Sequence, residues 1–276
     1  MNRSMNRNKS KDRPIAAAFQ FLSRIPVPLE VDFTPEVLRR SVKHYPLVGF
    51  AIGAVLSVVA ALSAWLLPPM PAAVVTLAAW IWLTGGLHLD GWMDSADALL
   101  SYRSREKMLE IMKDSRVGAM GVIACVLLLL FKMSLLATLI GSGFVYIGAA
   151  LLMATVWSRW FMTYALKVWP TAREGEGLAE RFHGQTAGDI TISTIVALLL
   201  SALGLTLVAW WLIPPVSWML FLIYYLIVPC IVCFVGTLAA ARISKRLGGL
   251  TGDVYGALNE GLEAVVLLAA VIIFGR

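Results

Sequence analysis

Charged residues are scarce in this sequence. They make up 14% of its 276 residues, against about 25% in typical soluble domains. Hydrophobic residues reach 59%, and the mean hydropathy is +0.78. A soluble domain of this length has no need of so much apolar sequence, so that class is excluded. The apolar residues form long runs, each near the roughly 20 residues that a helix needs to cross the hydrocarbon layer. The composition therefore predicts an all-α polytopic integral membrane protein.

Cysteines are also few. The three cysteines, Cys125, Cys230 and Cys233, all lie within apolar runs. Cys230 and Cys233 have CxxC spacing, but no second pair accompanies them and no loop holds a His–Cys cluster. We expect them to pack as small side chains of membrane helices, which argues against a zinc or redox site.

A continuous basic stripe is absent as well, although the net charge is +6 and the isoelectric point is near 9.4. Lys and Arg lie mainly in the segments that flank the apolar runs, where basic residues normally keep loops in the cytoplasm. They are interleaved there with acidic residues, as in ordinary topology-setting loops. We therefore expect the lipid bilayer as a partner and no nucleic acid.

The sequence contains seven apolar runs in what we take as a single membrane-embedded domain, residues 1–276. The runs lie at 46–68, 72–88, 118–140, 143–169, 190–213, 216–241 and 262–275. About seven transmembrane helices are predicted, or six if the short second or seventh run is re-entrant. The basic residues 1–14 are expected to form a flexible tail, followed by a short interfacial or re-entrant helix over 15–23.

The connections between the runs alternate in charge. The turns near 69–71, 141–143 and 214–217 contain no charged residue, whereas sixteen of the 17 acidic residues lie in segments 1–45, 89–117, 170–189 and 242–261. The positive-inside rule predicts that these segments and the N-terminus face the cytoplasm, with the protein in the cytoplasmic membrane. A transporter needs polar groups near the bilayer middle. Polar residues gathered on one face instead indicate an enzyme whose cytoplasmic loops form the active site.

Three aspartates form the most informative pattern. Asp90, Asp94 and Asp97 are spaced by four and then three residues, which places their carboxylates on one face of a helix. No basic residue from 87 to 102 neutralises them, so a bound cation is the simplest compensation for their repulsion. Hard oxygen ligands suit Mg²⁺, with Mn²⁺ as a substitute. The alternative is a solvated acidic face at the start of a helix.

Basic residues in and near the charged segments are candidate phosphate ligands. Lys113 and Arg116 flank Asp114, which could ligate a metal or accept a proton. The alternative is that Lys113 and Arg116 only set the orientation of the next helix in the membrane. Arg159 lies in an apolar run, where an isolated charge costs about 3 kcal/mol on insertion scales, so we expect it to bind an anionic substrate. Lys132, in another run, is expected to snorkel or to pair internally.

Two glycine-containing segments add further polar residues. Segment 170–189 contributes Arg173, and segment 248–260 contributes Thr251, Asp253 and Asn259. Glycine-rich backbone lets a phosphate approach closely and offers N–H donors, although membrane loops also use glycine simply to turn.

Along nearly its whole length the sequence resembles the cobalamin synthases, which are adenosylcobinamide-GDP ribazoletransferases. The motifs that carry the resemblance include FLSRIPVP at 21–28, TGGLHLDGWMDSADALL at 84–100, REKMLEIMKDSRVGAMGV at 105–122 and GGLTGDVYGALNE at 248–260. The usual central motif of that family has Glu where Leu89 stands and Gly where Ala98 stands. The three aspartates are then the minimal metal set.

The resemblance implies a reaction and its partners. A hydroxyl of α-ribazole, free or as the 5′-phosphate, attacks the phosphoryl group that joins the cobinamide arm of adenosylcobinamide-GDP. GMP leaves and adenosylcobalamin, or its phosphate, forms in a Mg²⁺-dependent transfer. The expected metal ligands are Asp90, Asp94, Asp97 and Asp253. Asp97 and Asp114 are the expected catalytic residues, and the expected substrate-binding residues are Lys113, Arg116, Arg159, Arg173, Thr251 and Asn259. A homo-oligomer is left open.

Two alternatives are another membrane enzyme and a protein of a different class. A CDP-alcohol phosphotransferase of phospholipid synthesis also combines membrane helices with stacked aspartates. Its signature requires Gly, Ala and Arg after the Asp, however, and Ala98 and Leu99 follow Asp97 here. A membrane transporter would explain the apolar runs and Arg159, but not the gathering of the acidic residues in four segments.

Overall fold

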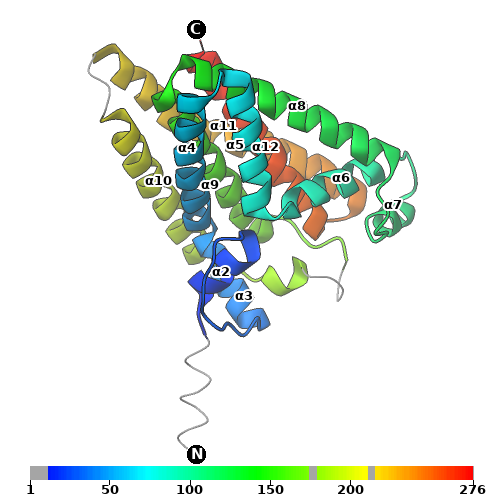
Figure 1. Ribbon diagram of the computed structural model, residues 1–276. Helices are drawn as coiled ribbons and strands as arrows, with labels where there is room; N and C mark the ends of the chain where they lie inside the picture. The colour runs from blue at the N-terminus through cyan, green and yellow to red at the C-terminus, as the bar shows by residue number, and fades with distance from the viewer. Residues whose placement is uncertain (1–11, 174–178, 211–214, 276) are drawn as a thin grey trace, which may run out of the picture.

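The computed structural model describes residues 12–173, 179–210 and 215–275, and within these ranges the chain is helical without a β-strand (Figure 1). Among the described residues, six helices are long and apolar enough to cross a membrane: Pro35–Leu66 (α3, η1 and α4 in series), α8 (Ala119–Ser142), α9 (Phe144–Val168), α10 (Ala187–Ala209), α11 (Pro215–Leu247) and α12 (Gly252–Phe274). The prediction of an all-α polytopic membrane protein is confirmed. Residues 1–11 of the predicted tail 1–14 and the predicted turn residue Pro214 lie outside the described residues, and Pro14 already begins a helix.

Two chargeless turns join antiparallel helices as predicted. Helix α4 (Tyr45–Leu66) ends just before the prolines that begin α5 (Pro69–Thr84), and α8 ends at Ser142, two residues before α9 begins. Proline is tolerated in the first turn of a helix because the N–H that it lacks would have no partner there. The tight turns therefore form helical hairpins.

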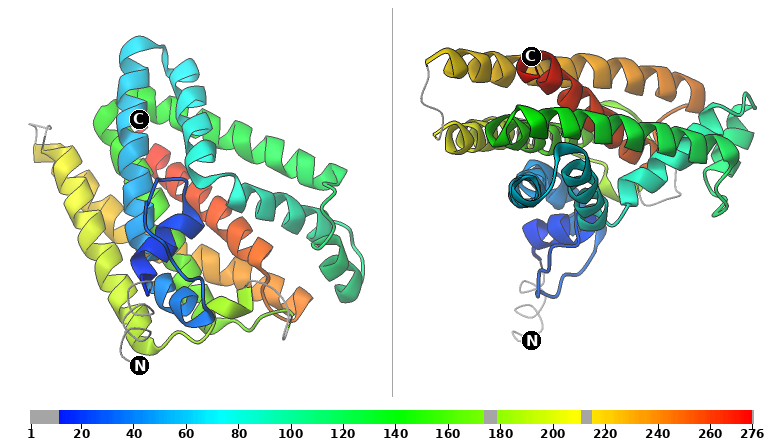
Figure 2. Two further views of the ribbon diagram at one scale, coloured as in Figure 1. Left: turned by 60° about the horizontal axis from the view of Figure 1, so that its bottom comes forward. Right: turned by 45° about the horizontal axis from the view of Figure 1, so that its top comes forward.

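Helix α5 stops earlier than the 72–88 run predicts. It ends at Thr84, and the chain turns by 91° into α6 (Leu87–Leu99). Gly85 and Gly86 make the turn with φ angles of 67° and 73°, a left-handed conformation that glycine adopts without a steric penalty. As Figures 1 and 2 show, α6 runs off to one side of α5. The second apolar run is thus broken at Gly85 and Gly86. The aspartates that follow it lie on a separate helix, α6.

Helix α12 begins ten residues before the apolar run predicted at 262–275. The prediction treated 248–260 as a loop because it contains Asn259 and Glu260, but both are buried side chains of α12. Glu260 and the neighbouring Glu263 form ion pairs with Lys132 of α8 at 2.6 Å. Buried carboxylates are tolerated in a membrane helix when they are paired in this way.

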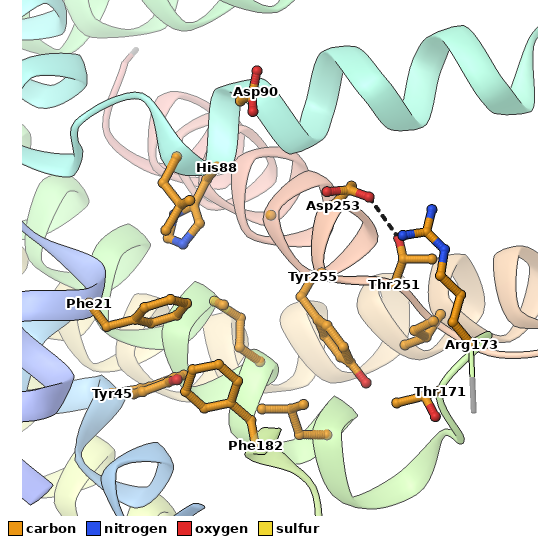
Figure 3. Close-up of a pocket in the computed structure, with 16 residues that line it drawn as sticks. Phe21, Tyr45, His88, Asp90, Thr171, Arg173, Phe182, Thr251, Asp253 and Tyr255 are labelled. Atoms are coloured by element: carbon orange, nitrogen blue, oxygen red, sulfur yellow. Dashed lines mark hydrogen bonds between the residues drawn. The ribbon is translucent and has the colours of Figure 1, made fainter. Parts of the chain in front are cut away.

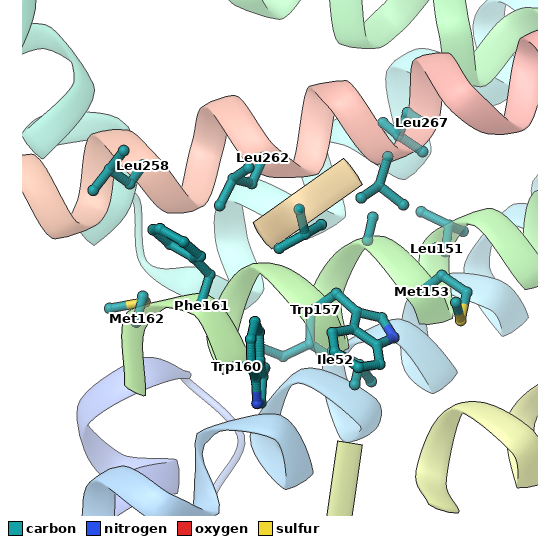
Figure 4. Close-up of a cluster of buried hydrophobic side chains, with 14 of the residues drawn as sticks. Ile52, Leu151, Met153, Trp157, Trp160, Phe161, Met162, Leu258, Leu262 and Leu267 are labelled. Atoms are coloured by element: carbon teal, nitrogen blue, oxygen red, sulfur yellow. The ribbon is translucent and has the colours of Figure 1, made fainter. Parts of the chain in front are cut away.

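Helix α9 is the centre of the bundle and is largely buried. Figure 4 shows Phe161 of α9 facing Leu258 and Leu262 of α12, whereas Trp157 lies beside Ile52 of α4. On another side α4 approaches so closely that a Cβ added at Gly49 would lie 2.2 Å from the carbonyl oxygen of Thr155. Close packing through small residues is what stabilises helix pairs in lipid, where no hydrophobic effect drives them together.

Short helices cover one end of the bundle. Helix α2 (Pro14–Leu22) fulfils the prediction of a short helix near 15–23 and packs on α3 (Pro35–Ser41) and α4. Helix α7 (Arg105–Ile111) follows α6, and η2 (Ala179–Phe182) precedes α10. Together with α6 they surround the start of α12, where the candidate site lies.

Candidate active site

The site is built on the crossing of α6 and α12, where two glycines let the backbones meet. A Cβ added at Gly91 of α6 would lie 2.6 Å from the carbonyl oxygen of Asp253, and one at Gly256 of α12 would lie 3.1 Å from the Cα of His88. No larger residue fits this contact without displacing a helix. The crossing therefore sets Asp90 and Asp94 of α6 beside the first turn of α12.

A hydrogen-bonded turn fixes that first turn. Thr251 is the N-cap of α12: its Oγ1 accepts a hydrogen bond from the N–H of Val254 and donates one to Asp253 Oδ2, each at 3.3 Å. An N-cap of this type stabilises a helix by about 1 kcal/mol. Thr251 thus orients Asp253 as well as starting the helix.

The segment before η2 is tied to the same turn. Ala172 N–H donates to the carbonyl of Leu250 at 3.0 Å, and Leu250 N–H donates to the carbonyl of Pro170 at 2.9 Å. This bridge places Arg173 beside Asp253 (Figure 3), and Arg173 Nη2 donates to the carbonyl of Leu109 at 2.9 Å. Three segments distant in sequence therefore meet at one place.

A cavity of about 210 Å³ opens between these segments. Figure 3 shows that its two ends differ in character. Asp90, Asp253, Arg173 and Thr251 line one end, which we call the ionic end. The other, which we call the aromatic end, is lined by Phe21, Tyr45, Phe182, Tyr255 and His88. Helices α6 and α12 supply much of the lining, so the active site is less a set of loops than the sequence predicted.

Four of the predicted site residues line this cavity, and Asp94 lies one helical turn beyond Asp90. Partial burial of Asp94, together with the negative charges of Asp90, Asp253 and Asp97, raises its pKa from 3.8 to about 6. The four predicted metal ligands therefore form one electrostatic cluster. Such a cluster attracts a cation, because a cation relieves the repulsion that raises the pKa.

The carboxylates at the ionic end suit Mg²⁺ better than a metal ion that takes all of its ligands from the protein. Within the described residues, no three His, Cys, Asp or Glu side chains converge closely enough to hold a metal ion by themselves. Mg²⁺ is usually bound by one or two carboxylates, while water and substrate phosphates complete its octahedron. The carboxylates Asp90 and Asp253, which line the cavity, match that requirement.

Asp97 has a structural partner that the sequence did not reveal. Its two carboxylate oxygens accept hydrogen bonds from the N–H groups of Gly118 (2.7 Å) and Gly121 (2.8 Å), at the start of α8. A Cβ at Gly121 would lie 2.4 Å from the same carboxylate. Asp97 thus caps α8 from another helix, and its predicted roles in metal binding and proton transfer stay predictions.

Lys113, Asp114 and Arg116 lie in the turn between α7 and α8 and do not line the cavity. Arg116 donates to Asp114 at 2.7 Å, and this hydrogen bond is the main cause that lowers the pKa of Asp114 to about 2. A carboxylate with so low a pKa is a weak base near neutral pH. Proton acceptance by Asp114, like phosphate binding by Lys113 and Arg116, stays a prediction.

Arg159 and Asn259 belong to a buried network beneath the cavity. Arg159 is fully buried and pairs with Glu263 at 2.8 Å, while Lys132 bridges Glu263 and Glu260. Internal pairing of Lys132 is therefore confirmed. Asn259 Nδ2 lies 3.1 Å from Glu263 and 2.9 Å from Nδ1 of His88. Neither Arg159 nor Asn259 lines the cavity, so the geometry offers no support for direct substrate binding by either.

The aromatic end could not be predicted from the sequence. Phe21, Tyr45, Phe182 and Tyr255 are indistinguishable in sequence from the many aromatic residues of an apolar bundle, and they come from α2, α4, η2 and α12. His88 gave one usable signal, because a histidine two residues before an acidic triad and two residues after a pair of glycines is uncommon in an apolar run. Its importance depends on Asn259, 171 residues away.

Comparison with known proteins agrees with the resemblance of the motifs. Residues 14–271 match the family described as cobalamin-5-phosphate synthase. A relative from Brevibacillus brevis, named adenosylcobinamide-GDP ribazoletransferase, is 39% identical over 254 residues, 92% of this chain and 96% of the relative. Relatives with that name from Desulfitobacterium hafniense and Shewanella amazonensis are 36% and 32% identical, each over 94% of this chain and over 96% and 95% of their own lengths. No solved structure matches the chain. The family match spans every residue that lines the cavity.

Proposed function

This chain belongs to the cobalamin-5-phosphate synthase family, and we propose that it is an adenosylcobinamide-GDP ribazoletransferase that acts in cobalamin synthesis. The structural observation that carries the proposal is the ionic end of the cavity. Two carboxylates, Asp90 and Asp253, and one guanidinium, Arg173, meet there from three separate segments. That combination suits the transfer of a phosphoryl group, which needs positioning and charge neutralisation more than covalent help.

The proposed reaction breaks a phosphoanhydride bond and forms a phosphodiester bond. A ribose hydroxyl oxygen of α-ribazole, or of its 5′-phosphate, forms a bond to the phosphorus that carries the cobinamide arm. The bond between that phosphorus and the GMP oxygen breaks, GMP leaves with the electron pair, and the hydroxyl proton is released. The family description favours the phosphorylated acceptor, since it names a cobalamin phosphate as the product.

The residues at the ionic end have distinct parts in this proposal. Arg173 binds the oxygens of the transferred phosphoryl group: its Nε has no hydrogen-bond partner among the described residues, and a guanidinium donates well to phosphate oxygens. Thr251 holds Asp253 in place through the hydrogen bond at 3.3 Å. Mg²⁺ bound by Asp90 and Asp253, with Asp94 nearby, would neutralise the phosphoryl oxygens and the departing GMP.

We also propose that the protein lies in the cytoplasmic membrane and that the cavity faces the cytoplasm. The support is the concentration of basic residues in the segments around the cavity, which the positive-inside rule assigns to the cytoplasmic side. GDP-linked substrates and Mg²⁺ are available there.

GMP release by the purified protein tests the function. The protein in detergent or lipid would be incubated with adenosylcobinamide-GDP, Mg²⁺ and either α-ribazole or its 5′-phosphate. We expect one equivalent of GMP per cobalamin product. Asp90→Asn and Asp253→Asn should lower kcat on the order of a hundredfold, the usual cost of removing one electrostatic stabiliser. Asp32→Asn, which changes a carboxylate in the segment between α2 and α3, is the matched control and should retain activity.

Two results would contradict the proposal. A folded protein that releases no GMP with either acceptor is not the proposed enzyme. Release of CMP from a CDP-alcohol with a lipid acceptor would support the phospholipid alternative instead.

A further inference from the structure

The aromatic end of the cavity has no part in phosphoryl transfer, yet it is a built site. Phe21, Tyr45, Phe182 and Tyr255 converge on it from four different elements (Figure 3). The rings of Phe21 and Phe182 lie with centroids 4.7 Å apart. Aliphatic and methionine side chains complete the wall: Leu87, Met162, Leu166 and Leu250. An aromatic-lined pocket of this kind suits a flat ring that can stack on its walls.

A buried histidine is directed into this largely apolar surrounding. His88 is 2% exposed, and its ring points toward the aromatic end in Figure 3. Its Nε2 has no hydrogen-bond partner among the described residues. Buried polar groups in native proteins almost always have a partner. A buried nitrogen without one, facing a cavity, therefore points to a ligand atom that satisfies it.

The network beneath the cavity determines whether that nitrogen donates or accepts. Glu263 accepts hydrogen bonds from Lys132 and Arg159. A carboxylate paired with these cations has no hydrogen to donate. The Asn259 atom 3.1 Å from it is therefore the donating amide nitrogen, Nδ2. The same Nδ2 lies 2.9 Å from Nδ1 of His88 and donates its second hydrogen there. Nδ1 is then the acceptor, and in a neutral imidazole the proton lies on Nε2. His88 thus presents an N–H donor to the aromatic end.

We propose that the aromatic end binds the base of α-ribazole and that His88 Nε2–H donates a hydrogen bond to the unsubstituted ring nitrogen of that base. The inference rests on the proposed function. α-Ribazole carries a dimethylbenzimidazole, a flat bicyclic ring with one acceptor nitrogen and two methyl groups. One donor within aromatic and aliphatic walls matches that pattern. His88 is then a substrate-binding residue, and Asn259 is a positioning residue that fixes its tautomer.

Size and hydrogen-bonding pattern distinguish this base from the other groups that the reaction involves. Pockets for drug-sized ligands measure about 300–1,000 Å³, so a cavity of about 210 Å³ is too small for a corrinoid ring. The guanine of GDP presents several donors on its pairing edge, and these require acceptors that the side chains of the aromatic end provide poorly. With the benzimidazole at this end, the attached ribose points toward Asp90, Asp253 and Arg173, where the transfer takes place.

The test removes the proposed hydrogen bond first by changing the substrate and then by changing the protein. Wild-type protein is assayed for GMP release with α-ribazole and with the matching indole nucleoside, in which a C–H replaces the acceptor nitrogen. We expect wild type to prefer α-ribazole by about tenfold or more in kcat/KM, the usual effect of leaving a buried donor unpaired. His88→Ala should lose most of that preference and raise the KM for α-ribazole, with the KM for adenosylcobinamide-GDP unchanged within about twofold.

Two further variants complete the design. His88→Gln, whose amide can donate from a similar place, should recover part of the preference. His44→Ala changes a histidine that does not line the cavity and should keep it in full. A wild type that turns over both nucleosides equally well overturns the inference without any variant. An effect of His88→Ala on the KM for adenosylcobinamide-GDP alone would assign the pocket to guanine. Absence of GMP release by wild type from α-ribazole would instead contradict the proposed function itself.

Discussion

Asp94 belongs to a group of carboxylates that repel one another. Its pKa is raised to about 6 by partial burial and by Asp90, Asp253 and Asp97. Between pH 3.8 and about 6 the folded protein holds this proton more tightly than the unfolded chain does, so the free energy of unfolding falls as the pH rises through that window. Without a cation, ionisation of Asp94 therefore destabilises the fold at neutral pH. A divalent cation that binds the ionised cluster would reverse the effect.

This electrostatic coupling predicts a pH dependence of the magnesium requirement. Because the cation competes with a proton on Asp94, the Mg²⁺ concentration for half-maximal GMP release should rise about tenfold per pH unit below pH 6. It should be nearly constant above pH 7. Asp94→Asn should remove the dependence, whereas Glu110→Gln, which changes an exposed carboxylate paired with Lys107, should keep it. A half-maximal concentration that is the same at pH 5 and pH 8 in wild type would refute the coupling.

At the residue scale, the sequence predicted what helix geometry determines locally. The spacing of Asp90, Asp94 and Asp97 was sufficient to place them on one helix, and all three lie in α6. It could not predict that Arg159 pairs with Glu263, because that contact joins residues 104 positions apart. An intramembrane arginine suggests a substrate or a partner equally well, and tertiary packing decides between them.

At the scale of elements, α6 links the active site to the start of α8. The glycines before it turn the chain by 91°, and Asp97 near its C-terminal end accepts from two backbone N–H groups of the Gly118–Gly121 turn. These N–H groups belong to the first turn of α8, whose orphan donors need acceptors. The carboxylates on one face of α6 thus have different functions. Asp97 caps α8, whereas Asp90 lines the ionic end of the cavity.

The capping contact predicts that the three aspartates differ in their effect on stability. Asp97→Asn keeps only one of two acceptor oxygens and should lower the free energy of unfolding by about 1 kcal/mol, the usual value of a cap. Asp90→Asn should leave it unchanged or raise it, because a repelling charge is removed. Thermal unfolding in detergent, without Mg²⁺, measures both variants. Equal midpoints for Asp97→Asn and wild type would show that the cap contributes nothing.

The boundaries of α5 and α12 mark where the sequence-based prediction of elements was wrong. Apolar periodicity extended the second run through Gly85 and Gly86, although two successive glycines favour a change of direction. Polarity made the seventh run begin too late, because Glu260 is paired with Lys132 only in the folded bundle. Hydropathy alone does not distinguish a polar loop from a polar face that other helices satisfy.

At the scale of the whole molecule, the order of the helices agrees with the alternation of charge. Helices α4, α8, α10 and α12 all begin in or next to a charged segment, and α9 and α11 end next to or in one. Turns near Met70 and Ser142 lie at the other ends of these helices. This agreement was predictable, because both the length of a span and the charge of a loop are properties of the local sequence.

The alternation predicts which parts of the chain can be labelled from each side of the membrane. In a protein with Cys125, Cys230 and Cys233 replaced by serine, single cysteines would be introduced as Met70→Cys and Ser142→Cys at the hairpin turns. Ser115→Cys would mark the turn between α7 and α8. An impermeant maleimide should label the first two in intact spheroplasts and the third only in inverted vesicles, because basic residues retain their segments in the cytoplasm. Labelling of Ser142→Cys from inverted vesicles alone would reverse the orientation. It would also place the ionic end, with Asp90, Asp253 and Arg173, on the side away from cytoplasmic GDP-linked substrates, and the proposed function would then require a different supply of substrate.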